Sequence, residues 1–189
     1  MGQVRRVVTG HDGNGKAIVV SDSAAPIHGN PLRPGQLSHE IWKTNAMPIP
    51  IGRDEPDPVT GPRQLHPAPN GTIFRISEVP PESDAIRNMT PEQARAAFRA
   101  SGAEAASTWG RGGRHPLMHR TETVDYAVVL EGEITLILDE GEVNLKAGDV
   151  VIQRGTNHAW SNRSGKVAKM LYVLIDGRFD PALAAQFQK

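Results

Sequence analysis

Three side chains that can bind a metal ion or transfer a proton lie in the second half of the sequence: His119, Asp125 and His158. His119 and Asp125 have the same parity in one extended segment, so their side chains are expected on the same face of a strand. His158 belongs to a later segment and can supply a second imidazole from a neighbouring wall. Two imidazoles and one carboxylate suit non-haem iron, and also zinc, manganese or nickel. These residues predict a divalent metal site without identifying the metal.

Short strands must position these three residues. After Arg114 the apolar residues recur with the period of a strand, and glycine-containing turns separate the runs. The expected strands span residues 126–130, 133–138, 143–145, 150–153, 158–162 and 169–175. Strands this short at near-regular spacing predict an all-β protein with a single closed antiparallel barrel of the jelly-roll type.

The first part of the chain adds further strands and a long irregular segment. The expected strands span residues 3–9 and 16–20, which form a hairpin, then 37–44 and 72–79. Residues 46–71 hold seven prolines, too many for the interior of a sheet. A segment of this length and composition predicts a proline-rich arm wrapped on the barrel or a flap over its site.

Two short helices complete the expected fold. Thr90, Pro91 and Gln93 have the order of a helix cap, a first-turn proline and the partner of a capping box, which predicts a helix over 91–100. Asp180-Pro181 predicts a second helix ending at Phe187. We divide the chain into N-terminal strands and arm (1–71), a lead-in strand and helix (72–113), the barrel core (114–178) and a C-terminal helix (179–189).

Composition narrows the classes of protein. The chain has 189 residues, 21 Lys and Arg against 21 Asp and Glu, and no cysteine. A neutral chain without a basic block is not expected to bind nucleic acid, and the missing cysteines exclude disulfides and thiolate metal sites. No apolar run approaches the length of a membrane span, and the first residues lack the apolar core of a signal peptide. We therefore expect no membrane partner and a cytoplasmic location.

The spacing around His119 resembles the first motif of cupins, the small single-domain proteins of conserved-barrel type. That motif has a glycine, His-any-His, an acid and a second glycine. Gly113 precedes His119 by the spacing of the family, Asp125 takes the position of the acid, and Gly132 follows after six residues. Thr121 stands where the family has its second histidine, and Asp125 replaces the usual glutamate. The resemblance therefore implies a metal site that has lost one ligand.

The segment around His158 resembles the second cupin motif, Pro-any-Gly-any-any-His with an asparagine four residues beyond. Gln153 replaces the proline, while Gly155, His158 and Asn162 match. His115 or Glu122 would be the fourth ligand or the general base in place of the missing histidine, although Glu122 has the opposite strand parity.

The resemblance implies a homodimeric, metal-dependent enzyme acting on a small organic, aromatic or polyketide-like molecule. Dioxygenase, decarboxylase, isomerase and dehydratase chemistry all fit, so an oxidoreductase or a lyase is expected. Thr121, Trp160 and Arg154 are candidates for the substrate pocket, although Trp160 could equally fill the core. The alternative is a non-catalytic, metal-free barrel that binds a small molecule, with the histidines as hydrogen-bonding wall residues.

Overall fold

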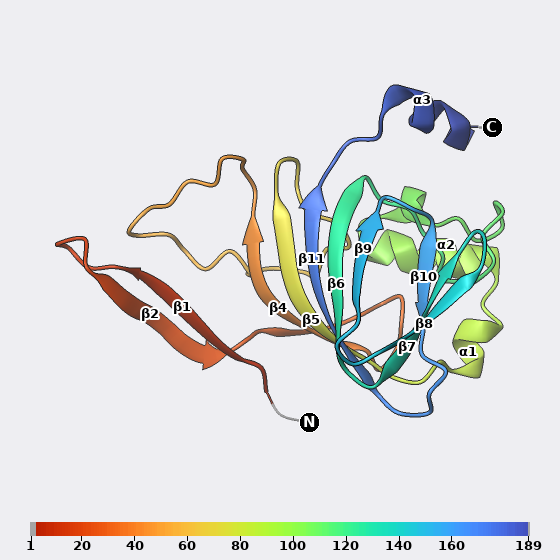
Figure 1. Cartoon of the computed structure of the whole chain (residues 1–189), viewed down its shortest axis with the longest axis horizontal. Coiled ribbons are helices and arrows are strands. Elements are labelled where there is room, and N and C mark those ends of the chain that lie inside the picture. Colours follow the sequence, from red (N-terminus) through yellow and green to blue (C-terminus); the bar gives the residue numbers. More distant parts are fainter. Residues whose placement is uncertain (1–2, 189) are drawn as a thin grey trace.

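The computed structural model describes residues 3–188, whose strands form three antiparallel sheets (Figure 1). The largest sheet has six strands in the order β3-β4-β5-β11-β6-β9, the second has the order β10-β7-β8, and β1 pairs with β2 alone. The strands are β1 (Arg5–His11), β2 (Ala17–Ala24), β3 (Ile27–Gly29), β4 (Leu37–Thr44), β5 (Thr72–Val79), β6 (Thr123–Glu131), β7 (Glu133–Leu138), β8 (Glu142–Lys146), β9 (Val150–Arg154), β10 (His158–Ser161) and β11 (Ala168–Asp176). The expected hairpin and antiparallel β-barrel are confirmed.

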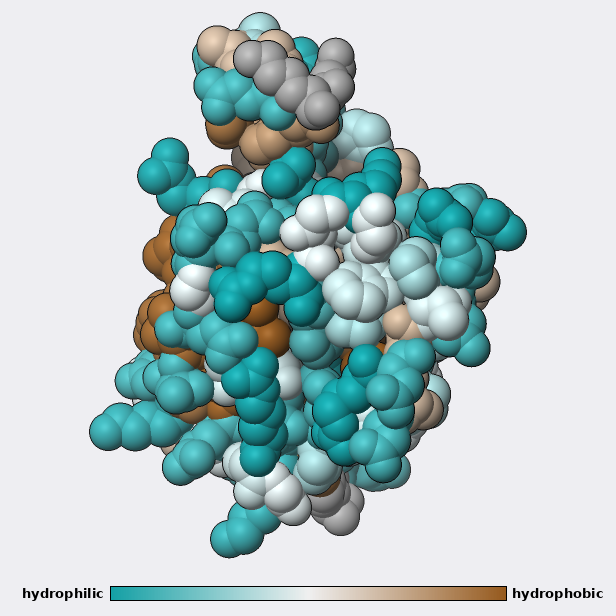
Figure 2. Space-filling model, turned by 90° about the vertical axis from the view of Figure 1, so that its right-hand side faces the viewer, coloured by the Kyte–Doolittle hydropathy of each residue, from teal (hydrophilic) through white to brown (hydrophobic). Residues whose placement is uncertain are grey.

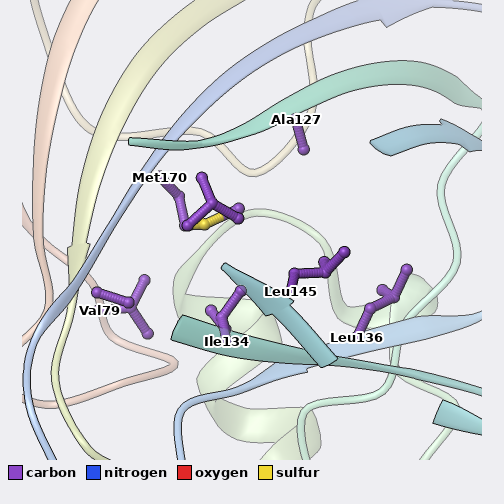
Figure 3. Packing of buried hydrophobic residues seen from close by; sticks show 8 residues of the cluster. Val79, Ala127, Ile134, Leu136, Leu145 and Met170 are labelled. Carbon is purple, nitrogen blue, oxygen red and sulfur yellow. The ribbon is translucent and has the colours of Figure 1, made fainter. Parts of the chain in front are cut away.

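The two larger sheets face each other across an apolar core (Figure 3). Because side chains alternate between the two faces of a strand, every second residue of β6 and β11 points inward. The inward side chains meet residues of β7 and β8 in one cluster: Val79, Ala127, Val129, Ile134, Leu136, Leu145, Ala168 and Met170. Gly132, with a φ of 76°, joins β6 to β7 at the position of the last glycine of the first motif. This core fills one end of the barrel.

A second apolar cluster lies under the helices. These are α1 (Asp84–Arg87), α2 (Pro91–Ala100) and the 3-10 turn η1 (Glu104–Ala106), which lie beside the smaller sheet (Figure 1). The hydroxyl of Thr90 accepts a hydrogen bond from the backbone N–H of Gln93, and the Gln93 side chain accepts one from Thr90, so the expected capping box is confirmed. Phe98 of α2 is fully buried and packs with Leu32, Leu65, Ile86 and Leu117.

The structure adds elements that the sequence did not predict. Strand β3 and helix α1 are new, and the expected C-terminal helix consists of α3 (Pro181–Ala184) and the 3-10 turn η2 (Ala185–Gln188). Strands β3, β4 and β5 belong to the same sheet as β6 and β11, so the barrel draws on residues ahead of 114. No helix among residues 3–188 is long and apolar enough to cross a membrane.

The proline-rich segment between β4 and β5 has no regular secondary structure (Figure 1). It is anchored to the rest of the chain at several points. Arg6 of β1 forms an ion pair with Asp57, and the side chains of Val59 and Leu65 are only 3% and 8% exposed. The backbone N–H of Asn70 donates to the Asp176 carboxylate at 2.7 Å. The arm is therefore wrapped against the barrel along its second half.

Candidate functional site

A cavity of about 100 Å³ lies inside the barrel between the apolar core and the helices. Its walls come from β5, β6, β10 and β11, from the loop after β3, from the arm and from the segment that precedes β6. It is smaller than the engineered cavity of about 150 Å³ that admits benzene. The space therefore suits a molecule of a few carbon atoms, unless the arm moves.

His119 and His158 lie side by side on one wall of this cavity. Each donates its backbone N–H to the carbonyl of the other at 2.9 Å, and their ring centroids are 4.4 Å apart. This antiparallel bridge links the segment ahead of β6 to β10, so the two motifs meet through main-chain hydrogen bonds. Phe98 supports the pair from behind, with its ring 5.5 Å from that of His119.

The hydrogen bonds of the two rings determine which nitrogen faces the cavity. Nδ1 of His119 donates to the Leu117 carbonyl at 2.9 Å. Nδ1 of His158 lies 3.0 Å from the Thr156 carbonyl and 2.7 Å from the side-chain nitrogen of Gln153, the residue that replaces the motif proline. Nδ1 of each ring is thus hydrogen-bonded to neighbouring groups of the protein. This leaves Nε2 of each ring for a ligand in the cavity.

Both histidines are neutral at pH 7. Burial lowers the pKa of His119, opposed by its hydrogen bond to Leu117. Burial and, secondly, the neighbouring His119 lower the pKa of His158 to about 3. Both neutral imidazoles can bind a cation, but a pKa of about 3 makes His158 a weak base near neutral pH, so His119 is the proton acceptor of the pair.

Asp125 contributes a carboxylate to the same cavity. Its side chain is 6% exposed, and Oδ1 is buried without a hydrogen-bond partner. Burial raises the pKa of Asp125 to about 6, although a hydrogen bond from Thr123 and the charge of Arg75 oppose the shift. A carboxyl group with this pKa can exchange a proton near neutral pH, as acid–base catalysis requires.

Three arginines that the sequence analysis did not single out also line the cavity: Arg33, Arg63 and Arg75. Arg33 and Arg75 are 4% and 2% exposed, and burial lowers the pKa of both. Arginine stays protonated in proteins, so this end of the cavity is cationic. One sequence signal was available for Arg75, which interrupts the apolar strand β5 at an inward-facing position. The irregular segments that carry Arg33 and Arg63 gave none.

Of the three residues predicted for the substrate pocket, only Trp160 lines the cavity. Its ring is nearly perpendicular to that of His158, at a centroid distance of 6.0 Å. The Thr121 hydroxyl is hydrogen-bonded to Thr123 at 2.8 Å and faces a separate surface hollow. Arg154 is exposed at the end of β9 and does not line the cavity.

Neither candidate for the missing ligand reaches the histidine pair. Nε2 of His115 is 2.8 Å from the Glu82 carboxylate, and its Nδ1 accepts a hydrogen bond from the Leu117 backbone. Glu122 is exposed on the outer side, where it accepts a hydrogen bond from the backbone of Phe179. Sequence parity predicted the outward direction of Glu122, but the hydrogen bond of His115 with Glu82 had no sequence signal.

A metal ion in this cavity would depend on His119, His158 and Asp125 for its ligands. Two imidazole nitrogens and the unpartnered Asp125 oxygen have suitable chemistry. Within residues 3–188, however, no three histidine or acidic side chains are grouped closely enough to hold an ion. The adjacent arginines also oppose a dication. The arrangement as it stands does not fit a metal with three protein ligands.

Comparison with known proteins identifies the class of fold. Residues 108–174 match the family model of the cupin domain, so this part of the chain is a cupin domain and the resemblance of the two motifs is confirmed. The cupin domain of Cnp3 from Schizosaccharomyces pombe aligns with 96% of this chain and 92% of its own, at 10% identity and a TM-score of 0.43.

Relatives in fungi share either the barrel segment or most of the chain. Phomopsin biosynthesis cluster protein C' of Diaporthe leptostromiformis is 54% identical over 70 residues, which cover 36% of this chain and 37% of that protein. The cupin-domain-containing oxidoreductase virC of Hypocrea virens is 27% identical over 182 residues, covering 90% of this chain and 75% of its own. The chain thus matches about a third of the former relative and most of the latter.

Proposed function

We propose that this cupin domain is an enzyme that converts a small organic acid inside its barrel, and that an aromatic or polyketide-like acid enters only when the arm moves aside. The observation that carries the proposal is the juxtaposition, in one cavity, of His119, His158 and Asp125 with a cluster of guanidinium groups. Groups that can transfer a proton and groups that can hold an anion therefore line the same space. The names of relatives as oxidoreductases and biosynthesis-cluster proteins support an enzymatic role.

In acid–base chemistry, one set of cavity residues would bind the anion and another would transfer the proton. A substrate carboxylate or enolate oxygen would bind to the arginines, which form charge-assisted hydrogen bonds with such groups. Asp125 and His119 would move a proton at the carbon or oxygen next to the bound group. Decarboxylation, isomerisation and dehydration need such transfers, and burial among Trp160, Tyr172 and Leu174 would limit competing water.

A metal-dependent enzyme is the second candidate. It is favoured by the free Nε2 atoms of His119 and His158 and by the unpartnered Oδ1 of Asp125. A divalent iron, zinc, manganese or nickel ion would act as a Lewis acid, and iron would add dioxygenase chemistry. This candidate requires Asp125 to move closer to the two histidines, or a substrate oxygen to complete the ligand set.

Turnover measured with and without metal separates the two candidates. The untagged chain would be treated with a chelator, dialysed and incubated with acetoacetate, phenylpyruvate and benzoylacetate, and products would be followed by mass spectrometry. We expect product from the chelated protein under anaerobic conditions, because proton transfer by side chains requires neither a metal nor oxygen.

The other results have defined meanings. Product that returns only with one added metal, at one bound equivalent, supports the metal-dependent candidate. Acids that bind without being converted in any sample would overturn the enzyme proposal and support a binding barrel. A His158→Ala variant is the matched control, since it removes a cavity nitrogen in either candidate.

We also propose that the protein is a homodimer that packs through the outer face of its large sheet. The strand registers place apolar side chains on this face: Trp42, Phe74, Ile76, Val124, Tyr126, Val128, Val150, Ile152, Leu171, Val173 and Ile175. Tyr126, Val150 and Ile152 are 45%, 62% and 55% exposed. In Figure 2 apolar side chains gather along the left edge, the side that faces the viewer in Figure 1. Apolar patches of this kind are typical of interfaces.

An Ile152→Lys substitution should therefore disrupt the dimer. We expect light scattering on a sizing column to give twice the chain mass of 20.4 kDa for the unaltered protein and the chain mass for this variant. Leu183→Lys is the control, because Leu183 is 42% exposed on α3, away from the sheet. A monomeric unaltered protein at micromolar concentration, or a variant that remains a dimer, contradicts the proposed interface.

A further inference from the structure

The proline-rich arm delivers two side chains to the cavity, Arg63 and Leu65. The same stretch is held down by Arg75, whose guanidinium donates to the Gln64 carbonyl at 2.7 Å. Nε of Arg63 donates to the hydroxyl of Ser38 in β4 at 3.3 Å. Arg63 is thus positioned by both of its neighbouring strands, although it belongs to an irregular segment.

The guanidinium of Arg63 has an unused donor inside the protein. Its Nη1 is buried and has no hydrogen-bond partner. Leaving a charged donor without a partner costs free energy, and native proteins usually pair such groups. Arg33 has an unpartnered Nη1 in the same cavity, so the unused donors converge on one space.

The charges around Arg63 do not balance by themselves. Burial, and secondly the charge of Arg75, lower the pKa of Arg63, and Glu40 opposes this shift. Glu40 already lies opposite Arg75, with 3.6 Å between Oε1 and Nε. Asp125 is the single carboxylate among the cavity-lining residues, against three arginines. An incoming anion would reduce the repulsion between the guanidinium groups.

We infer that Arg63 is the specificity-determining residue of the cavity, which selects a carboxylate or enolate anion over a neutral molecule of the same shape. The inference rests on the proposed function and extends it to the role of the arm. The arm carries the arginine that recognises the acid and covers the cavity in the same position. Leu65, 8% exposed and packed in the second apolar cluster, holds this part of the arm in place.

The test compares two ligands that differ only in charge. Crotonate and crotonamide have the same planar carbon skeleton, and each would be titrated into the full chain at low ionic strength by calorimetry. We expect the unaltered protein to bind crotonate more tightly than crotonamide. In Arg63→Gln the affinity for crotonate should fall about 10- to 100-fold, with crotonamide unchanged, as expected for one lost charge-assisted hydrogen bond.

Two further variants separate recognition from folding. Arg53→Gln removes an exposed arginine of the same arm, paired only with Asp54, and should leave both affinities unchanged. Arg63→Lys keeps the charge but loses the planar fork, so it should retain part of the preference for crotonate. The melting temperature of each variant shows whether the arm still packs.

Each result has a separate meaning for the two proposals. If the unaltered protein prefers crotonate and Arg63→Gln keeps the full preference, the inference about Arg63 is overturned and the acid-binding cavity stands. Equal binding of crotonate and crotonamide by the unaltered protein overturns charge selection and leaves a neutral-ligand cavity. Binding of neither ligand overturns both proposals.

Discussion

Replacement of Phe98 with alanine should lower the free energy of unfolding by about 3–5 kcal/mol, the range for deleting a buried phenylalanine side chain. Phe98 is fully buried and belongs to the cluster that joins α2 to Leu32, Leu65 and Leu117. The cavity left behind cannot be filled without moving the helix, which the capping box fixes at its start. Because domains are stable by only about 5–15 kcal/mol, the loss should be evident in urea unfolding at 25 °C.

The Phe98 variant also tests whether the helix supports the site. The Phe98 ring lies against His119, and Leu65 and Leu117 of the same cluster line the cavity. Phe98→Leu restores most of the apolar volume and should recover most of the stability. Arg95→Ala on the exposed side of the helix should change stability by no more than about 0.5 kcal/mol. A loss for Phe98→Ala no larger than that of the surface variant would contradict this account.

Much of the fold follows from local sequence signals. The bounds of β4, β5, β7 and α2 coincide with the expected ranges, because alternation, capping residues and glycine turns are short-range patterns. Strand β3 was missed because three residues are too few for a period to appear. The pairing of β5 with β11, which brings β4 and β5 into the sheet of the barrel, was also missed, since pairing over long separations depends on packing that no local pattern records.

Only the site residues that belong to the two cupin motifs could be predicted from the sequence. The spacing around His119 and His158 predicted that two histidines meet, and the main-chain bridge between them brings this about. The arginines of the cavity were not predicted, because only the tertiary structure brings Arg63 of the irregular arm close to Arg75, which points inward from β5. The sequence also contained a signal for the outer face of the large sheet, because in β5, β6 and β11 this face is more apolar than the face that lines the cavity. An apolar outer face of this kind predicts that the sheet is covered on its outer side as well as on its cavity side.

Separate removal of Glu40 and Arg75 should each destabilise the protein by about 3–5 kcal/mol, because each substitution leaves a buried charge without its partner. The two residues face each other across β4 and β5 and are 0% and 2% exposed. Neither Glu40 oxygen accepts a hydrogen bond, and Lys43 is 3.8 Å away. We therefore expect both Glu40→Leu and Arg75→Met to lower the urea midpoint strongly.

The double variant should be much less damaged than the sum of the single variants. Apolar side chains of similar volume fill the same space without any desolvated charge, and such replacements of buried pairs are often neutral or stabilising. We expect a coupling energy of at least about 2 kcal/mol in the double-mutant cycle. The exposed pair Arg5 and Asp22 is the control, with side chains 73% and 44% exposed, and should show a coupling of about 0–1 kcal/mol. Additive losses at Glu40 and Arg75 would contradict the pairing.

The same variant tests why a costly ion pair lies beside the cavity. Glu40 holds one side of the Arg75 guanidinium, while the other side is bound to the arm at Gln64. If the pair serves acid binding, the double variant should fold with nearly full stability and lose the preference for crotonate over crotonamide. A double variant that keeps this preference would mean that Arg63 and Arg33 suffice for recognition. In that case the ion pair of Glu40 and Arg75 would be a feature of the sheet alone.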